Sequence, residues 1–223
     1  MEIYFIRHGE TAWNAQRRVQ GRSNIPLNDY GIALAKKTRE ALQAEGIIFD
    51  ACYSSPLDRA VQTAKILMEG TGIEPILDNR LVELDFGPYE GVSIPEVQTN
   101  PAYRTLFCCF HDPAHYIPEG TGEGYAAFVG RAGDFVKEIL CPLEGKKERV
   151  LISCHGALIR AALCAIFSRP IETFWDSVQL NCAVNKIILA DGAFSLAYEG
   201  KVFYEVEHPY VNPAGEKDEA SRS

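Results

Sequence analysis

The sequence contains no apolar stretch that approaches the roughly 20 residues needed for a membrane-spanning helix. The first residues, Met-Glu-Ile-Tyr-Phe, lack the basic segment that begins a signal peptide. Positive charge is also scarce: the formal net charge is −8, whereas a nucleic-acid-binding protein usually carries a basic face. Together these absences predict a cytoplasmic protein that has neither a membrane nor a nucleic acid as its partner.

Neither the cysteines nor the carboxylates form a recognisable metal site. The seven cysteines are odd in number and irregular in spacing, at positions 52, 108, 109, 141, 154, 164 and 182. We interpret them as reduced thiols, most of which fill the core. No group of carboxylates resembles a magnesium site either. We therefore expect the protein to use no metal ion and no cofactor.

The composition and the order of the elements predict one domain. Hydrophobic residues make up 47% of the 223 residues and charged residues 23%, as in ordinary globular proteins of this size. Strands are expected at 2–7, 50–54, 74–77, 149–154, 181–189 and 193–198, and helices at 28–45, 56–69, 93–100, 122–140, 157–167 and 170–176. Ser55 is the expected N-cap of the second helix and Pro56 its first residue. This alternation predicts a single three-layer α/β/α domain with a mainly parallel sheet over residues 1–211, followed by a frayed tail at 212–223.

Arg7 and His8 stand at the end of the first expected strand, directly after the apolar run 3–6. An imidazole is a nucleophile only when it is neutral, and a neighbouring guanidinium disfavours its protonation. The same guanidinium matches the paired oxygens of a phosphate group, and Gly9 lets the backbone come close to a ligand. A lone Arg-His pair more often belongs to a packed core, so its interpretation depends on the rest of the chain.

Three other strand ends carry similar side chains. His155 follows the apolar run 150–153, Arg59 lies on the first turn of the helix after the second strand, and Glu83 follows a short extended run. Because ligands of open α/β sheets bind beyond the carboxyl ends of the strands, we expect these groups to meet the Arg-His pair in one crevice. Cys154, beside His155, is interpreted as a small residue packed at a strand end rather than as a nucleophile.

With these residues in place, the chain resembles the histidine phosphatase superfamily, on the branch shared by cofactor-dependent phosphoglycerate mutases and their phosphatase relatives. The matching motifs are Arg-His-Gly-Glu-Thr at 7–11, Trp13-Asn14, Gln20-Gly21, Pro-Leu-Asn-Asp-Tyr-Gly at 26–31, the run 54–64 that begins Ser-Ser-Pro-Leu-Asp-Arg, Glu-Leu-Asp-Phe-Gly at 83–87 and Ser-Cys-His-Gly at 153–156. Their order and spacing make the resemblance specific. It implies a phosphoglycerate mutase-like fold and an enzyme that transfers phosphoryl groups.

The resemblance also implies a role for each residue of the crevice. His8 would be the nucleophile that takes the phosphoryl group as a phosphohistidine. Arg7, Arg59 and His155 would surround the transferring oxygens and stabilise their charge. Glu83 would protonate the leaving oxygen in the first step and activate water in the second.

Five further positions complete the implied site. Asn14, Thr11 and the backbone N–H of Gly156 are expected to add hydrogen-bond donors for the phosphate. Gln20 and Gly21 match positions that line the substrate side in the family. For these two residues, a turn that packs against the Arg-His strand is an equally good interpretation.

Residues 101–124 form a long stretch with little periodicity and many aromatic side chains. Such a stretch inside a compact domain is usually a lid or a binding loop, and the resemblance implies a lid over the mouth of the active site. Its aromatic residues fit a partly apolar leaving group, or equally a small core of the lid itself. His111 and His115 have the spacing of a helical metal site, but Pro113 between them opposes an uninterrupted helix.

Cations outside the phosphate site distinguish the activities of the family. A phosphoglycerate mutase must hold a carboxylate as well as a phosphate, and no adjacent arginines lie between residues 90 and 125. Arg22, Arg80 and Arg104, the other cations expected near the mouth, are isolated from one another. This pattern favours a metal-independent phosphomonoesterase for a small phosphorylated metabolite. A mutase-type isomerase and a non-catalytic module that binds a phosphorylated ligand are the alternatives, and the oligomeric state is left open, a homodimer included.

Overall fold

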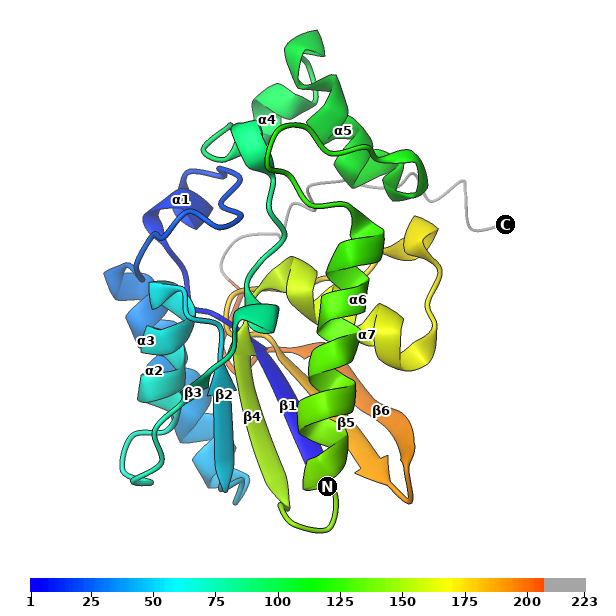
Figure 1. Ribbon diagram of the computed structural model, residues 1–223. Coiled ribbons are helices and arrows are strands. Elements are labelled where there is room, and N and C mark those ends of the chain that lie inside the picture. Colours follow the sequence, from blue (N-terminus) through cyan, green and yellow to red (C-terminus); the bar gives the residue numbers. More distant parts are fainter. Residues whose placement is uncertain (207–223) are drawn as a thin grey trace.

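A six-stranded sheet forms the centre of the computed structural model, which describes residues 1–206 (Figure 1). Its strands are β1 (Glu2–Arg7), β2 (Ala51–Ser54), β3 (Ile76–Leu77), β4 (Arg149–Cys154), β5 (Val184–Ala190) and β6 (Ala193–Lys201). They lie in the order β3-β2-β4-β1-β5-β6; the first four are parallel, while β5 and β6 run antiparallel to their neighbours. The mainly parallel sheet predicted from the sequence is confirmed.

Helices cover both faces of this sheet. The four long helices that do so are α2 (Asp29–Ala44), α3 (Asp58–Leu67), α6 (Tyr125–Phe135) and α7 (Gly156–Phe167). Because successive side chains of a strand point to opposite faces, Ile3 and Phe5 join one apolar core with residues of α6 and α7. Tyr4 and Ile6 pack into a second core with residues of α2 and α3. The fold is therefore the expected three-layer α/β/α arrangement.

The helix α3 begins later than expected. Ser55 is not its N-cap and Pro56 is not its first residue, because the helix begins only after Leu57, which is the N-cap. Ser55 instead prolongs the strand, since its backbone N–H donates to the Ser153 carbonyl at 3.0 Å. The hydroxyl that was expected to cap the helix lies 2.8 Å from Nε2 of His155.

Several other expected elements are shorter or divided. The helix expected at 93–100 is the shorter α4 (Ile94–Val97), and the helix expected at 170–176 is a single turn (Ile171–Thr173). The helix expected at 122–140 is divided into α6 and a π-helical turn (Val136–Leu140). The strand expected at 74–77 is the two-residue β3. Gly122 and Gly124 account for the late start of α6, because glycine is unfavourable inside a helix. A short helix, α1 (Ala12–Ala15), lies between β1 and α2.

The segment 101–124, expected to be irregular, contains the helix α5 (Arg104–His111). Leu106, Cys109 and Phe110 are its buried residues, and their spacing of three and four places them on one face. The helix ends before Pro113, whose ring and missing N–H oppose its continuation. Together with α4 it lies beyond the carboxyl ends of the parallel strands (Figure 1). Side chains of α5 can therefore reach the expected crevice.

Two further expectations concern the C-terminal tail and membrane-spanning helices. The frayed tail expected at 212–223 lies outside the described residues. Within residues 1–206, no helix is both long and apolar enough to cross a membrane.

Candidate active site

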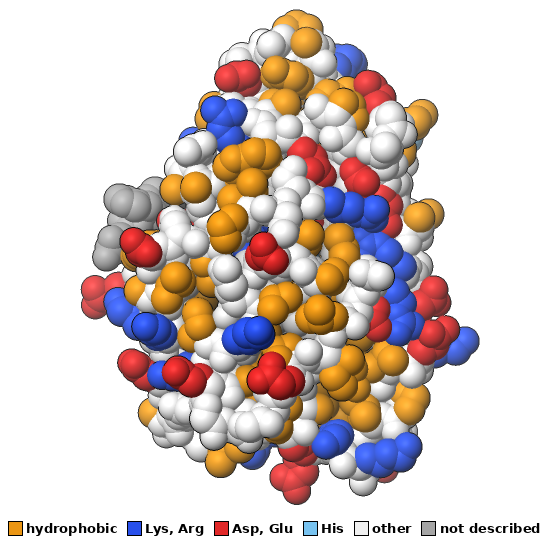
Figure 2. Space-filling view, turned by 60° about the vertical axis from the view of Figure 1, so that its left-hand side comes forward, with side chains coloured by type: hydrophobic (Ala, Val, Ile, Leu, Met, Phe, Trp, Pro, Cys, Tyr) orange, Lys and Arg blue, Asp and Glu red, His pale blue; other side chains and the backbone are white. Residues whose placement is uncertain are grey.

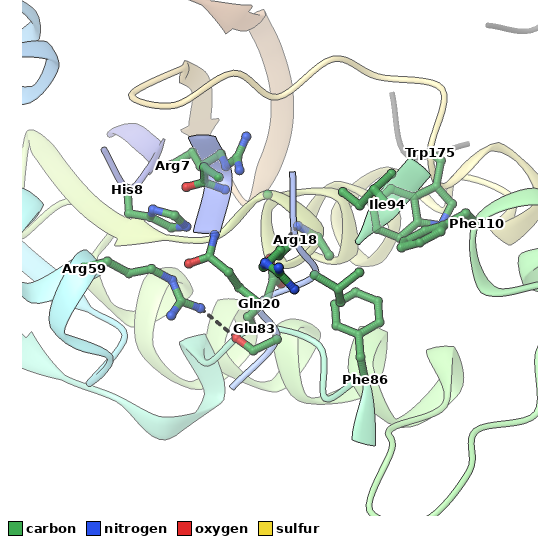
Figure 3. A pocket seen from close by; sticks show the side chains of 15 residues that line it. Arg7, His8, Arg18, Gln20, Arg59, Glu83, Phe86, Ile94, Phe110 and Trp175 are labelled. Atoms are coloured by element: carbon green, nitrogen blue, oxygen red, sulfur yellow. Dashed lines mark hydrogen bonds between the residues drawn. The ribbon is translucent and has the colours of Figure 1, made fainter. Parts of the chain in front are cut away.

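A pocket lies at the carboxyl ends of β1 and β4 (Figure 3). It is lined by Arg7, His8, Asn14, Arg18, Val19, Gln20, Gly21, Arg59, Glu83, Phe86, Ile94, Phe110, Gly156, Ala157 and Trp175. About 580 Å³ of space lies between these walls, counting the part open to solvent. All the site residues expected from the sequence line this pocket except Thr11 and His155, which are buried behind it.

His8 directly follows β1 and is only 3% exposed. Its Nδ1 lies 2.6 Å from the Gly9 carbonyl oxygen, and because a carbonyl can only accept, Nδ1 carries the proton and donates it. In the neutral ring, Nε2 then has the lone pair. Burial, followed by the charges of Arg59 and Arg7, holds the pKa of His8 well below its usual range, so the ring is neutral at neutral pH. The side chain thus has the protonation state that a nucleophile requires.

His155 follows β4, and its ring centroid lies 5.2 Å from that of His8. Arg59 Nε donates to Nδ1 of His155 at 3.3 Å, so the neutral ring carries its proton on Nε2 and donates it to Ser55 Oγ. Burial and the charge of Arg59 hold the pKa of His155 well below its usual range. In this arrangement His155 supports Arg59, and direct contact with phosphate oxygens stays a prediction. Ser55 is a site residue that the sequence presented only as a helix cap.

Arg59 is fully buried on the first turn of α3. Its Nη1 donates to the Ser23 carbonyl and its Nη2 to the Gly21 carbonyl, both at 2.7 Å. Burial lowers the pKa of Arg59 to about 10, which leaves it charged at neutral pH. Gly21 has a φ of +52°, and a Cβ there would overlap the Glu90 carboxylate, so glycine is favoured. Gly21 lines the pocket and its carbonyl holds Arg59, while packing of its turn against the Arg-His strand stays a prediction.

The other expected donors differ in their positions. Thr11 caps α1, and its hydroxyl donates to Gln20 Oε1 at 2.9 Å, so its contact with phosphate stays a prediction. Asn14 Oδ1 accepts from the Thr11 N–H at 3.2 Å and from Asn181 Nδ2 at 3.3 Å. These donors occupy the amide oxygen of Asn14, and donation by its NH₂ group to a phosphate stays a prediction. Gly156 is the first residue of α7 and lines the pocket, while donation by its N–H stays a prediction.

Two further cations lie in the pocket wall. Arg7 ends β1, and its Nη1 donates to the Gln179 carbonyl at 2.6 Å. Arg18, which the sequence analysis did not single out, donates from Nη1 to the Gly91 carbonyl at 2.7 Å and from Nε to Gln16 Oε1 at 3.1 Å. Arg18 is exposed, whereas Arg7 is partly buried beside His8. The pair Arg7 and Arg59 therefore provides buried positive charge in the pocket, and Arg18 lies nearer to solvent; binding of a phosphate by the pair stays a prediction.

Arg22, Arg80 and Arg104, expected near the mouth, do not line the pocket. Arg22 lies 3.4 Å from the carboxylate of Asp85, and Arg80 lies 2.6 Å from that of Asp78. Arg104 begins α5. On the face drawn in Figure 2, basic and acidic side chains are interspersed in the same way. Attraction of an anion thus depends on the cations of the pocket itself.

The carboxylate of Glu83 lies at the N-terminus of α7. Oε2 accepts from the Ala157 N–H at 3.1 Å, and Oε1 accepts from the N–H groups of Leu158 and Leu84, both at 3.0 Å. The first N–H groups of a helix have no partner within the helix, so a carboxylate is favourable there. The helix thereby holds the carboxyl group in the same pocket as His8 (Figure 3).

Arg131 of α6 holds the segment that leads to Glu83. Its Nη1 donates to the carbonyls of Arg80 and Val82 at 2.7 and 2.6 Å, and its Nη2 donates to the Glu83 carbonyl at 3.1 Å. Glu123 pairs with the same guanidinium at 2.7 Å. No local pattern reveals Arg131, because these carbonyls lie 48 to 51 residues away in the sequence.

We expect Arg131→Met to destabilise the protein by about 2–3 kcal/mol and to lower turnover of an alkyl phosphate, because three carbonyls and a carboxylate lose their donor. Denaturant unfolding and steady-state kinetics measure the two effects. Arg149→Met is the matched control: Arg149 pairs with Glu2 at the opposite end of the sheet, so a loss of only about 0–1 kcal/mol and normal turnover are expected. Equal effects in both variants would contradict a positioning role for Arg131.

The remaining wall of the pocket is apolar. Phe86, Ile94, Phe110 and Trp175 form it, and we call these four residues the apolar wall (Figure 3). The ring centroids of Phe86 and Phe110 are 5.9 Å apart and those of Phe110 and Trp175 are 5.1 Å apart, so the three rings are contiguous. Tyr116 does not line the pocket and is buried in the main core, of which Phe110 is also a member. Phe110 thus packs in the main core and also lines the pocket, whereas Tyr116 fills the core of the whole domain rather than a small core of the lid itself.

The other candidate side chains lie outside the pocket. Cys154 is buried, and burial raises the pKa of its thiol far above the usual range, as expected of a packing residue. His111 Nε2 lies 3.1 Å from Gln98 Oε1, and His115 Nδ1 lies 2.8 Å from Asp112 Oδ1, so the two histidines have separate partners. Over residues 1–206, no three His, Cys, Asp or Glu side chains lie together in a way that could hold a metal ion.

Comparison with known proteins gives one consistent result. The family model of the histidine phosphatase superfamily (branch 1) matches residues 3–200. The structure of YhfR from Bacillus stearothermophilus is 32% identical, with a TM-score of 0.81 over 90% of this chain and 97% of that one. Phosphoserine phosphatase 1 of Hydrogenobacter thermophilus is 29% identical over 79% of this chain and 81% of its own length. A protein of Proteus mirabilis named "Probable phosphoglycerate mutase GpmB" is 29% identical over 84% of each chain.

Proposed function

The chain belongs to the histidine phosphatase superfamily and is a phosphatase, and on that premise we propose that it hydrolyses small phosphomonoesters through a phosphohistidine at His8. The observation that carries the proposal is a neutral His8, with its lone pair on Nε2, in one pocket with Arg7 and Arg59. A small phosphorylated metabolite as substrate, a cytoplasmic location and a lid formed by 101–124 belong to the same proposal.

In the first step, the substrate phosphate lies against the guanidinium groups of Arg7 and Arg59. Nε2 of His8 attacks phosphorus, and the bond between phosphorus and the ester oxygen breaks. Glu83 gives its proton to that oxygen, so the alcohol leaves neutral. The two arginines stabilise the charge on the transferring oxygens, which is the main requirement of phosphoryl transfer.

In the second step, a water molecule takes the place of the alcohol. Glu83, now a carboxylate, accepts a proton from this water as its oxygen attacks phosphorus. The bond between phosphorus and Nε2 breaks, which restores neutral His8 and releases inorganic phosphate. Because Glu83 gains the proton that it gave up in the first step, the cycle closes without a further reactant.

Release of inorganic phosphate should greatly exceed phosphoryl transfer between hydroxyl groups. A mutase must keep its intermediate from water and hold a second anionic group, whereas beyond Arg7 and Arg59 this pocket has the apolar wall and the exposed Arg18. We expect interconversion of 2- and 3-phosphoglycerate to be at least about tenfold slower than the best hydrolysis, or about 1.4 kcal/mol in barrier. Phosphate release and isomer ratio, measured with 2,3-bisphosphoglycerate present, test this.

Two results of that assay would favour the alternative functions. Rapid interconversion with little free phosphate would identify an isomerase, in agreement with the name of the Proteus mirabilis relative. Tight binding of phosphorylated ligands without any turnover would identify a binding module.

Excess chelator should leave the activity unchanged. Arg7 and Arg59 already provide two positive charges at the phosphate, so a divalent ion is not needed to neutralise it. Initial rates before and after dialysis against chelator give the measurement. A loss that one divalent ion restores would contradict this expectation, and His111 and His115 would be the first residues to replace.

A further inference from the structure

The apolar wall indicates what kind of alcohol leaves the phosphate. We infer that the preferred substrate is the phosphate monoester of an apolar alcohol whose hydrocarbon body packs against Phe86, Ile94, Phe110 and Trp175. This inference rests on the proposed function, because it takes the phosphate to lie at His8. The cations and the apolar wall line the same pocket, so a monoester bound at His8 directs its alcohol to the wall (Figure 3).

Trp175 presents hydrocarbon to the pocket. An indole has a single N–H donor, and that of Trp175 donates to the Cys109 carbonyl at 2.9 Å and to Tyr125 Oη at 2.8 Å. Tyr125 Oη donates to the same carbonyl at 2.8 Å. The polar edge of the ring is thus directed into a buried network that joins α5 to α6. The guanidinium of Arg160 lies over the ring, 5.0 Å from its centroid, and carbon atoms that it leaves uncovered line the pocket.

The wall exists before any ligand binds. Phe86, Phe110 and Trp175 are 5%, 3% and 6% exposed, so most of each ring is packed in the core and a small part faces the pocket. Phe174 packs edge-on against Trp175 from behind, with 5.3 Å between the ring centroids. Rings held in this way lose little conformational entropy on binding, so contact with an apolar ligand is favourable.

A second anionic group on the alcohol would be poorly accommodated. Next to the apolar wall a carboxylate would lose hydration, which is costly unless it gains a hydrogen-bond donor. The guanidinium of Arg160 lies 5.0 Å from the Trp175 ring centroid, but it donates to the Ser177 carbonyl and does not line the pocket. Beyond Arg7 and Arg59, Arg18 is the cation among the residues that line the pocket in the described part of the chain. Its Nη1 and Nε already donate to Gly91 and Gln16, and the side chain is exposed to screening by solvent.

Three primary alkyl phosphates distinguish a preference for an apolar alcohol from a preference for a small or an anionic one. Because their leaving oxygens are chemically alike, differences in kcat/KM report on binding of the alcohol. The three esters are 2-phenylethyl phosphate, ethyl phosphate and 3-phosphoglycerate. We expect kcat/KM for the phenylethyl ester to exceed that for each of the other two by about tenfold or more. Equal kcat/KM values for the three esters would overturn the inference. A preference for 3-phosphoglycerate that Arg18→Met removes would also overturn it, because the preferred substrate would then be an acid bound by Arg18.

Phe110→Ala and Phe107→Ala provide a matched pair on α5. Phe107 stacks on His111, is 36% exposed and does not line the pocket. We expect Phe110→Ala to reduce the preference for the phenylethyl ester by about tenfold through a higher KM, while Phe107→Ala keeps it. Ile94 is half-buried, so Ile94→Ala is a milder change that should reduce the same preference. This variant provides the test if Phe110→Ala does not fold. An unchanged preference in both pocket variants would overturn the inference.

Failure of this inference can be distinguished from failure of the proposed function. Hydrolysis of all three esters at similar kcat/KM would leave the phosphatase mechanism in place and remove only the apolar preference. If no ester is hydrolysed, calorimetric titration with 3-phenylpropylphosphonate and propylphosphonate still tests the wall. About tenfold tighter binding of the phenyl compound that Phe110→Ala abolishes would support the inference, and equal binding would overturn it.

Discussion

His8→Ala should lower kcat by at least about 10⁴-fold for every phosphomonoester, because the variant lacks the atom that receives the phosphoryl group. In the unaltered protein, a rapid quench into base during turnover of labelled substrate should trap phosphate on His8. The adduct should be stable in base and labile in acid, as a phosphoramidate is. Peptide mapping by mass spectrometry then locates the label.

Cys154→Ala is the control for this experiment, since Cys154 is the other conceivable nucleophile at the strand ends. Its thiol is buried and its pKa is raised by that burial, so the variant should retain turnover within a few-fold. Label recovered on Cys154, or full activity in His8→Ala, would refute the assignment. Circular dichroism of both variants shows whether a loss of activity comes from unfolding.

Glu83→Gln should lower kcat/KM for an alkyl phosphate by about 10²–10⁴-fold and that for p-nitrophenyl phosphate far less. An alkoxide is a poor leaving group that needs a proton, whereas p-nitrophenolate leaves without one. Glutamine keeps the shape and can still accept from Leu158 and Leu84, but its NH₂ group cannot accept the bond that Oε2 receives from Ala157. Stability should therefore fall by about 1–3 kcal/mol, which denaturant unfolding measures separately.

The ratio of the two substrates is the decisive quantity for Glu83. A structural loss lowers both rates alike, whereas loss of the acid lowers only the rate of the demanding ester. Glu83→Asp keeps a proton donor at a shorter reach, so it should regain part of the alkyl phosphatase activity. Equal losses on both esters in Glu83→Gln would mean that the carboxylate serves only to cap α7.

Much of the phosphate site is encoded locally. Two apolar runs are recognisable in the sequence, one that ends in Arg7 and His8 and one that ends before His155. A strand that is buried on both faces must be apolar, whereas the residues at its end can be polar. Parallel strands place all these ends at one edge of the sheet, so Arg59 and Glu83 could be assigned to the same crevice. The motif spacing then identified the family that the comparisons show.

The tertiary structure decided which partner each of these groups has. From the sequence Ser55 could be recognised only as a helix cap, whereas the packing of β2 against β4 places its hydroxyl against His155. Arg131 is tied to Glu83 across 48 residues, and Arg18 enters the pocket through pairing with Ser93. Side-chain contacts of this kind depend on how whole elements dock, which no local spacing specifies.

The apolar wall shows most clearly which features local sequence patterns predict and which depend on packing. From the sequence, the aromatic residues of 101–124 could equally contact a ligand or fill a lid, because periodicity reports that a face is buried and not what buries it. The structure distinguishes them: both pack in the main core, but Phe110 also lines the pocket, whereas Tyr116 does not. Trp175 joins Phe110 from 65 residues further along the chain, because the turn Ile171–Thr173 packs against the turn Pro113–His115 that follows α5. The fold class and the phosphate chemistry could thus be inferred from local patterns in the sequence. The surface that meets the rest of the substrate was decided by packing between distant elements.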